Sequence, residues 1–235
     1  MASAATSFDT LADFRNELIR KHLKGAVFLA EDSVAIPASF TAGATADLQM
    51  LPDGFESLGK LSVDGAPKYT PEIKTSEIES FGDLESSRED IISRNTTIEL
   101  TSHETRRKTL ELYTGVDLSK VTPDATTGEL RFAEPTTPAT KFYRYLHLGV
   151  DGAGDRAIYI WRIAPRFQIT GVGAQQATKD GAMAYPLTGK AKVDSAAGYA
   201  IAWAFGGPGW KPLLAKMGWT DTANPVRTSE ENKQR

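Results

Sequence analysis

Among the side chains that can act in catalysis, carboxylates form the densest cluster in this 235-residue sequence. Seven of them, against two basic residues, give residues 72–90 a local charge of −5: Glu72, Glu77, Glu79, Asp83, Glu85, Glu89 and Asp90 against Lys74 and Arg88. Paired carboxylates can catalyse glycoside hydrolysis. A glycosidase cleft also needs aromatic platforms for the sugar rings, and only Tyr69 and Phe81 lie nearby. We therefore interpret the acidic segment as solvated charge or as part of an interface.

Three short motifs approach known binding patterns without completing them. GFESLGKL (54–61) matches a phosphate-binding loop, except that Leu61 replaces the Ser or Thr that holds Mg²⁺. GVGAQQ (171–176) has Gln176 where a dinucleotide fingerprint has its third glycine. DGAGD (151–155) lacks the fuller ligand set of a calcium loop and is typical of a hairpin turn. None of the three supports a nucleotide or calcium site.

The remaining reactive residue types are sparse. His22, His103 and His147 lie far apart and have no Ser or Asp arrangement typical of a catalytic triad. The chain has no cysteine, which excludes disulfides, thiolate metal sites and thiol nucleophiles. We therefore expect no metal, no cofactor and no enzymatic activity. The four tryptophans leave one other function open, a carbohydrate- or receptor-binding β-sandwich of a virion or cell surface.

Helical spacing is found in two places. Residues 9–22 are predicted to form a packed helix capped by Asp9, because four residues recur at intervals of three and four: Leu11, Phe14, Leu18 and His22. Thr101 and Glu104 form a capping-box pattern ahead of a second helix that ends at Gly115. Residues 31–54 and 117–140, rich in Pro, Thr or small residues, are expected to form long loops.

The rest of the pattern predicts a mainly β, antiparallel fold with a flanking α-helix. Seven short apolar or alternating segments are the expected strands outside the acidic region: 25–30, 56–62, 141–150, 156–164, 166–172, 182–193 and 199–205. Residues 72–101 are predicted to form a long hairpin. Its second strand ends in RNTTIEL, whose period-2 alternation places Ile98 and Leu100 in the core and Asn95, Thr97 and Glu99 on the opposite face.

Composition limits the wider possibilities. The net charge of −3 argues against generic nucleic-acid binding, which usually needs a basic excess. No stretch approaches the roughly 20 apolar residues of a membrane span, and the N-terminus lacks the apolar run of a signal peptide, so we expect a cytoplasmic protein with no membrane insertion. We predict a single domain over residues 1–219, followed by a polar C-terminal extension over residues 220–235.

Residues 55–115 resemble the major tail protein, or tail tube protein, of long-tailed phages (siphoviruses) that infect actinobacteria. The resemblance rests on the order of four elements: Leu58-Gly59, the turn Asp64-Gly65, a strand that ends at Leu100, and a helix from Glu104 to Gly115. The segment MAYPLTGKAKVDSAAGYAIAWAFGG also resembles the last hairpin of that family. Together these segments cover about half of the chain.

The resemblance implies a β-sandwich or barrel with a flanking helix and long arms, in a structural virion protein. Six copies would close into a ring, and rings would stack into a tube that conducts the genome into the host. The implied partners are the tape-measure protein in the lumen, the tail terminator, distal tail or baseplate proteins, and double-stranded DNA in transit; assembly would take place in the host cytoplasm.

Two sets of residues receive roles under this hypothesis. The set predicted to face the lumen is Glu72, Lys74, Asn95, Thr97 and Glu99. Its carboxylates would repel DNA phosphates, so that the wall does not hold the passing genome. The set at the acidic tip of the hairpin, predicted to contact another subunit or ring, is Asp83, Glu85, Glu89 and Asp90.

Overall fold

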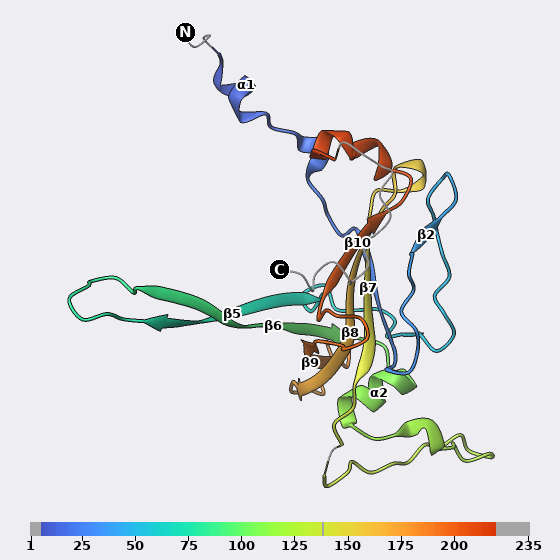
Figure 1. Ribbon diagram of the computed structural model, residues 1–235. Helices are drawn as coiled ribbons and strands as arrows, with labels where there is room; N and C mark the ends of the chain where they lie inside the picture. The colour runs from blue at the N-terminus through green and yellow to red at the C-terminus, as the bar shows by residue number, and fades with distance from the viewer. Residues whose placement is uncertain (1–5, 138, 220–235) are drawn as a thin grey trace.

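The computed structural model describes residues 6–137 and 139–219, and antiparallel strands dominate it (Figure 1). The prediction of a mainly β fold with a flanking helix is confirmed. The strands are β1 Lys24–Glu31, β2 Thr41–Ala42, β3 Asp47–Leu48, β4 Glu56–Ser57, β5 Lys68–Ile78, β6 Arg88–Ser102, β7 Tyr143–Asp151, β8 Ile158–Val172, β9 Tyr185–Lys192 and β10 Ala202–Gly206. The helices are α1 Phe8–Ala12 and α2 Arg107–Thr114. Short 3-10 turns are η1 Asn16–Leu18, η2 Leu118–Lys120, η3 Gly154–Arg156, η4 Lys211–Leu213 and η5 Ala215–Met217.

One eight-stranded sheet contains all strands except the small β2–β3 hairpin. Its order is β4-β1-β7-β8-β9-β6-β5, and β10 also pairs with β8. Within residues 6–137 and 139–219 the path ends at β4 and β5, which do not pair with each other. We predicted a sandwich or a barrel, and within the described part of one chain the sheet does not close into a barrel.

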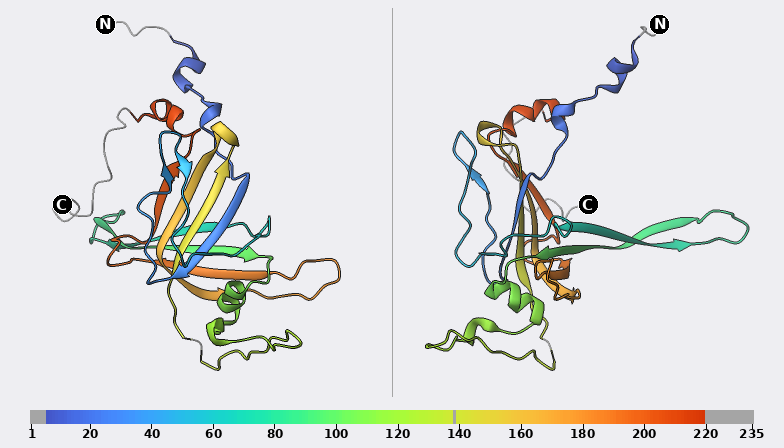
Figure 2. Two further views of the ribbon diagram at one scale, coloured as in Figure 1. Left: turned by 90° about the vertical axis from the view of Figure 1, so that its right-hand side faces the viewer. Right: turned by 180° about the vertical axis from the view of Figure 1, so that it is seen from behind.

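Strand β8 divides the sheet into two layers. Its first half pairs with β7 on one side and β10 on the other, whereas Arg166–Val172 pairs with β9. The layer of β4, β1, β7 and β10 therefore crosses the layer of β9, β6 and β5, as the left view of Figure 2 shows. We expected two strands here, separated at Pro165. Instead β8 is continuous. Pro165 has no amide to donate and so interrupts the pairing with the neighbouring strand, but β8 does not end there.

The core lies on both faces of the first layer. Between the two layers Tyr145 and Phe167 pack with their ring centroids 5.0 Å apart, next to Ile98 and Leu100. On the opposite face, Trp161 stacks on Phe40 from the predicted loop 31–54. That segment is a loop as predicted, apart from the β2–β3 hairpin, and it covers the back of the sheet.

Arg144 of β7 holds the bend of β8 in place. Its Nη1 donates to the carbonyl oxygen of Pro165 (2.6 Å) and to the carboxylate of Asp194, and its Nε donates to the carbonyl oxygen of Val34 (3.1 Å). Asp194 also accepts the amides of Ala196 and Ala197. Hydrogen bonds from those amides, together with Arg144, lower the pKa of Asp194 below its ordinary value.

Helix α2 begins later than the capping-box pattern predicts. The helix starts at Arg107, and Arg106 precedes it without a side-chain cap. Glu104 instead accepts the backbone amide of Lys60 at 2.8 Å, which ties the chain before α2 to the turn after Leu58. Gly59 in that turn has a φ of +77°, and an added Cβ would collide with the Glu104 carboxylate. The C-terminus at Gly115, with φ +72°, is as predicted.

The predicted helix over residues 9–22 is wrong. Only α1 (Phe8–Ala12) is helical, and Ser7, not Asp9, caps it. Asp13 ends it in the left-handed conformation, with φ +44°. Leu11 and Phe14 are 74% and 79% exposed, so the apolar stripe has no surface to pack against. A short helix without tertiary packing is only marginally stable in water, which explains why the spacing alone does not produce one.

The hairpin of β5 and β6 projects far from both layers (Figure 1). The predicted loop over residues 117–140 contains only the single turn η2 among its described residues. No helix in the described part of the chain is long and apolar enough to span a membrane. The extension predicted for residues 220–235 lies outside the described residues.

We expect Arg144→Lys to lower the free energy of unfolding by about 2 kcal/mol, because one ammonium group cannot replace the planar guanidinium fork at three partly buried acceptors. Urea unfolding followed by tryptophan fluorescence measures the change. The matched control is Arg131→Lys, at an exposed position, which should change the free energy by less than about 0.5 kcal/mol. Equal stability of the two variants would show that Arg144 does not hold the bend.

Candidate functional site

The candidate site is the β5–β6 hairpin with the two faces at its root. The register pairs Lys68 with Glu99, Thr70 with Thr97, Glu72 with Asn95 and Lys74 with Ser93. Cross-strand partners point to the same face, so all five residues predicted to face the lumen share one face: Glu72, Lys74, Asn95, Thr97 and Glu99. Ile98 and Leu100 are buried on the opposite face, as the alternation predicts. We call the face that carries these five residues the outer face of the hairpin layer.

The outer face continues across β9 and the second half of β8. Thr97 pairs with Lys190, which pairs with Gln168, and Lys192 pairs with Arg166. The charged side chains of this face at the hairpin root and on β9 and β8 are five basic and two acidic, a net charge of +3: Lys68, Lys74, Arg166, Lys190 and Lys192 against Glu72 and Glu99. The face is therefore polar and mildly basic, and the two carboxylates offset part of its positive charge.

One ion pair lies on this face at the root of the hairpin. The Nζ of Lys68 is 2.9 Å from the carboxylate of Glu99, with both side chains largely exposed. An exposed pair of this kind contributes at most about 1 kcal/mol to stability, because solvent screens it and both side chains lose conformational freedom. The charges of the outer face are thus available for contacts outside the chain.

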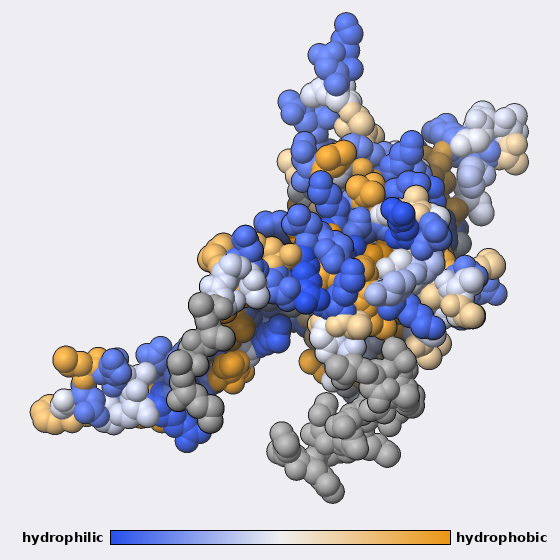
Figure 3. All heavy atoms as spheres, turned by 90° about the horizontal axis from the view of Figure 1, so that it is seen from above, coloured by the Kyte–Doolittle hydropathy of each residue, from blue (hydrophilic) through white to orange (hydrophobic). Residues whose placement is uncertain are grey.

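Most of the acidic charge lies in the distal half of the hairpin. Residues 75–90 carry six carboxylates and Arg88, a net charge of −5, and the four tip residues Asp83, Glu85, Glu89 and Asp90 are all exposed. Apolar residues alternate with them, and Phe81 and Leu84 are fully exposed. In the space-filling view the projecting hairpin shows apolar and polar residues side by side (Figure 3). A two-stranded ribbon is only marginally stable alone, so we expect another surface to cover these exposed side chains.

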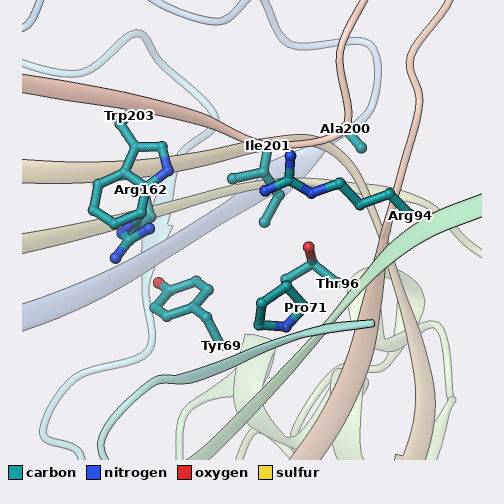
Figure 4. A pocket seen from close by; sticks show the side chains of 8 residues that line it. All are labelled: Tyr69, Pro71, Arg94, Thr96, Arg162, Ala200, Ile201 and Trp203. Atoms are coloured by element: carbon teal, nitrogen blue, oxygen red, sulfur yellow. The ribbon is translucent and has the colours of Figure 1, made fainter. Parts of the chain in front are cut away.

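A groove lies at the root of the hairpin, on the face opposite the outer face (Figure 4). It has a volume of about 560 Å³ and is formed by β5, β6, β8, β10 and the segment before β10. Its lining residues are Tyr69, Pro71, Arg94, Thr96, Arg162, Ala200, Ile201 and Trp203. No carboxylate lines it, so the groove combines two cationic side chains with aromatic and apolar walls.

Aromatic side chains fix Arg162 in the groove. Its guanidinium lies 4.9 Å from the ring centroid of Tyr69 and also over the ring of Trp203, its partner in the β8–β10 pairing. Trp203 stacks on Phe205 and Phe205 on Trp210, with centroid distances of 5.9 and 4.8 Å. Trp203 is 55% exposed, so an aromatic strip extends from the groove along the free edge of β10.

A polar cluster built around the buried side chains of Tyr145 and His147 lies behind the groove. The hydroxyl of Tyr69 is 2.9 Å from both the hydroxyl of Tyr145 and Nδ1 of His147. The ring of His22 stacks on His147 with a centroid distance of 5.4 Å. Gly149 makes this possible, since an added Cβ there would overlap the His22 ring. The cluster connects the N-terminal segment, β7 and the hairpin root.

Burial controls the protonation of this cluster. Burial, followed by the nearby His22 and Arg162, lowers the pKa of His147 to about 4. Burial and Arg162 lower the pKa of His22, and Asp151 opposes them. Burial raises the pKa of Tyr69 and of Tyr145 above their ordinary values. At neutral pH the four side chains are therefore uncharged, and Arg162 is the charged group beside them.

Sequence reasoning found the hairpin and its outer face but missed the groove. Its walls come from residues as far apart as Tyr69 and Trp203, and no short motif joins them. The signal that could have pointed to it is the segment IAWAF (201–205), where Trp203 and Phe205 alternate with alanines. The three histidines do not form a metal site: in the described residues no three His, Asp or Glu side chains are grouped to hold an ion.

Comparison with known families gives this geometry its context. The sequence matches the family described as phage tail tube protein over residues 14–205, which is most of the chain. The chain belongs to the phage tail tube protein family. It is therefore a structural protein of a phage tail and a component of the virion, and tail tube proteins assemble with copies of themselves and with other tail components.

Comparisons with individual proteins are weaker. No curated protein matches the sequence. Among solved structures, the virion of a native gene transfer agent particle is 14% identical with a TM-score of 0.36, covering 66% of this chain and 92% of that one. The 6-fold symmetrised baseplate of the anti-feeding prophage is 8% identical with a TM-score of 0.37, covering 87% and 97%. At such TM-scores neither structure supports a conclusion about this chain, so the family assignment rests on the family match alone.

The buried histidine predicts how this tail tube protein responds to acid. An unfolded histidine takes up a proton near pH 6.5, whereas folded His147 does so only near pH 4, so stability is lost as the pH falls through this window. We expect a loss on the order of 3 kcal/mol, at about 1.4 kcal/mol per pH unit. Urea unfolding of the wild-type chain and of His147→Gln, from pH 7 to pH 4, measures it.

The glutamine keeps a hydrogen-bonding partner for Tyr69 but cannot titrate, so His147→Gln should show a clearly smaller loss over this range. His103→Gln, at an exposed histidine, is the matched control and should follow the wild-type curve. Parallel curves for all three proteins would contradict the assignment of the acid sensitivity to His147.

Proposed function

We propose that six copies of this chain close into a ring and that rings stack into the tail tube of a siphovirus that infects actinobacteria. Double-stranded DNA then passes through the tube into the host. Membership of the tail tube family over residues 14–205 is the observation that carries the proposal. The number of copies and the type of phage follow the sequence resemblance of residues 55–115.

The open sheet supports self-assembly. Among the described residues, strands β4 and β5 end the path of the sheet and β10 pairs only with β8, so each has a row of backbone groups on its free side. Such edges invite pairing with another chain, and a ring can use them to continue the sheet from one copy to the next. The layer of β5, β6, β9 and β8 would thereby become a segment of the tube wall.

The outer face of the hairpin layer is the surface we assign to the lumen. It presents threonine, asparagine and charged side chains, while the opposite face of the same strands carries the core residues Ile98 and Leu100. Its five basic side chains would attract DNA phosphates, and Glu72 and Glu99 offset them. The role of the two carboxylates is thus to keep the wall from retaining the genome.

The remaining parts of the proposal concern partners. The tape-measure protein would occupy the lumen during assembly in the host cytoplasm, and the tail terminator and distal tail or baseplate proteins would bind the two ends of the tube. The chain would act through assembly, without catalytic activity or a cofactor.

A second candidate is binding of carbohydrate or of a receptor, which the exposed aromatic strip of Trp203, Phe205 and Trp210 favours. Negative-stain microscopy and size analysis of the purified full-length chain distinguish the two. Rings or tubes are expected under the first proposal. A monodisperse monomer that binds a glycan, and loses this binding in Trp203→Ala, would replace it with the second.

The lumen assignment predicts a defect in genome delivery. Glu72→Lys with Glu99→Lys changes the outer face from +3 to +7 per copy, so DNA phosphates should be retained during passage. The monomer should stay folded, with a loss of no more than about 1 kcal/mol, because Glu72 is exposed and the Glu99 side chain is 45% exposed. Ejection from particles containing the variant should fail at low salt and recover at high salt.

The matched control is Asp53→Lys with Glu129→Lys, which makes the same change of charge in exposed loops away from the outer face. Its ejection should match the wild type at every salt concentration. Normal low-salt ejection from tubes shown to contain the Glu72 and Glu99 variant would mean that these residues do not line the channel.

A further inference from the structure

We propose that the groove at the root of the hairpin binds the hairpin tip of a second copy of the chain. This inference rests on the proposed self-assembly and goes beyond it by assigning a donor, an acceptor and the residues of both. The acceptor is the groove between Arg94, Arg162 and Trp203. The donor is the segment Phe81 to Glu85.

The groove has the chemistry to accept an acidic and apolar peptide. Arg94 and Arg162 line it, and neither forms an ion pair with another described residue. Arg162 is held between two aromatic rings, so its position is set before a ligand arrives. A volume of about 560 Å³ falls within the range of pockets that bind ligands, roughly 300 to 1,000 Å³.

The tip has the complementary chemistry. The segment reads Phe-Gly-Asp-Leu-Glu, in which Phe81 and Leu84 are fully exposed and flank the carboxylates of Asp83 and Glu85. Gly82, with φ +97°, turns the chain so that the segment forms a protruding end. Apolar side chains can pack against Trp203 and Ile201 while the carboxylates meet the two arginines. Basic patch and acidic patch are complementary, which favours this pairing over wrong partners.

The tip cannot reach the groove of its own chain. Pro71 in the groove and Ser80 at the tip are nine residues apart along a strand, a separation of roughly 30 Å at about 3.3 Å per residue. The paired strands hold the tip away from the root, as Figure 1 shows. The occupant must therefore come from another copy.

This separation allows a head-to-tail assembly. Donor and acceptor lie at opposite ends of one hairpin, so each copy can give a tip to one neighbour and accept a tip from another. Such a heterologous contact closes into a ring or propagates as a filament. The same two surfaces also permit a reciprocal two-fold dimer, and size analysis of the assembled wild-type chain distinguishes that dimer from the rings or filaments that the proposal requires.

Cysteine crosslinking tests the contact without background, because the chain has no cysteine of its own. Leu84→Cys and Ala200→Cys are made in separate full-length chains that carry tags of different length, then mixed under conditions in which the wild-type chain assembles and oxidised mildly. We expect a disulfide-linked product that contains both tags. The matched control mixes Leu84→Cys with Met50→Cys, an exposed residue outside the groove, which should give little of this product.

Charge reversal gives a second arm. Arg94 lies on the exposed hairpin, so Arg94→Glu should leave the fold intact and reduce the yield of the two-tag product at least about tenfold. Combining Arg94→Glu in the acceptor chain with Asp83→Lys and Glu85→Lys in the donor chain should restore part of the yield. A yield that ignores these charges would overturn the role of the arginines.

The outcomes separate this inference from the proposal on which it rests. A wild-type chain that stays monomeric overturns both. A chain that assembles normally but gives no more product with Ala200→Cys than with Met50→Cys overturns the groove contact alone. If crosslinking equals the control and a DNA duplex binds the wild-type chain but not Arg94→Glu, the groove belongs to DNA and the inference is wrong.

Discussion

The continuous strand β8 is the constraint on which the rest of the molecule depends. Its first half carries β7 and β10, and its second half carries β9 and, through it, the hairpin. Both halves must therefore bend around one core, in which Tyr145 and Phe167 meet. The bend sits at Pro165, whose carbonyl oxygen accepts a hydrogen bond from the guanidinium of Arg144. One half-buried arginine thereby joins the two layers and the loops beside them.

A separation of charge along the hairpin follows from this arrangement. The root belongs to a layer whose outer face, with β9 and β8 included, is mildly basic, whereas the distal half leaves the sheet and carries a net charge of −5. Repulsion among those carboxylates and the exposure of Phe81 and Leu84 both disfavour an isolated hairpin. This charge repulsion and apolar exposure are compatible with function because a tail tube protein does not act as a single copy. Its least favourable surfaces are those that we expect assembly to cover.

The cluster of tyrosines and histidines around Tyr145 and His147 couples the hairpin root to the rest of the chain. Tyr69 belongs to the first strand of the hairpin, yet its hydroxyl is satisfied by Tyr145 and His147 of β7. The same ring supports Arg162, which faces the groove. A proton placed on His147 would meet the positive charge of Arg162 in a buried setting, so the neutral cluster and the cationic groove depend on each other.

The sequence determined the elements whose pattern is local and repeated. The period-2 alternation in RNTTIEL identified the buried and outer faces of β6, and Gly115 marked the end of α2, because these signals depend only on neighbouring residues. Periodicity failed over residues 9–22, since a helix of that length needs a packing surface that the chain does not supply. Pro165 suggested a break between strands, and only the pairing on both sides of β8 shows that the strand continues. The groove could not be read locally at all. Residues 134 positions apart, Tyr69 and Trp203, meet there only because β8 places the hairpin layer against β10, and that contact exists only in the folded chain.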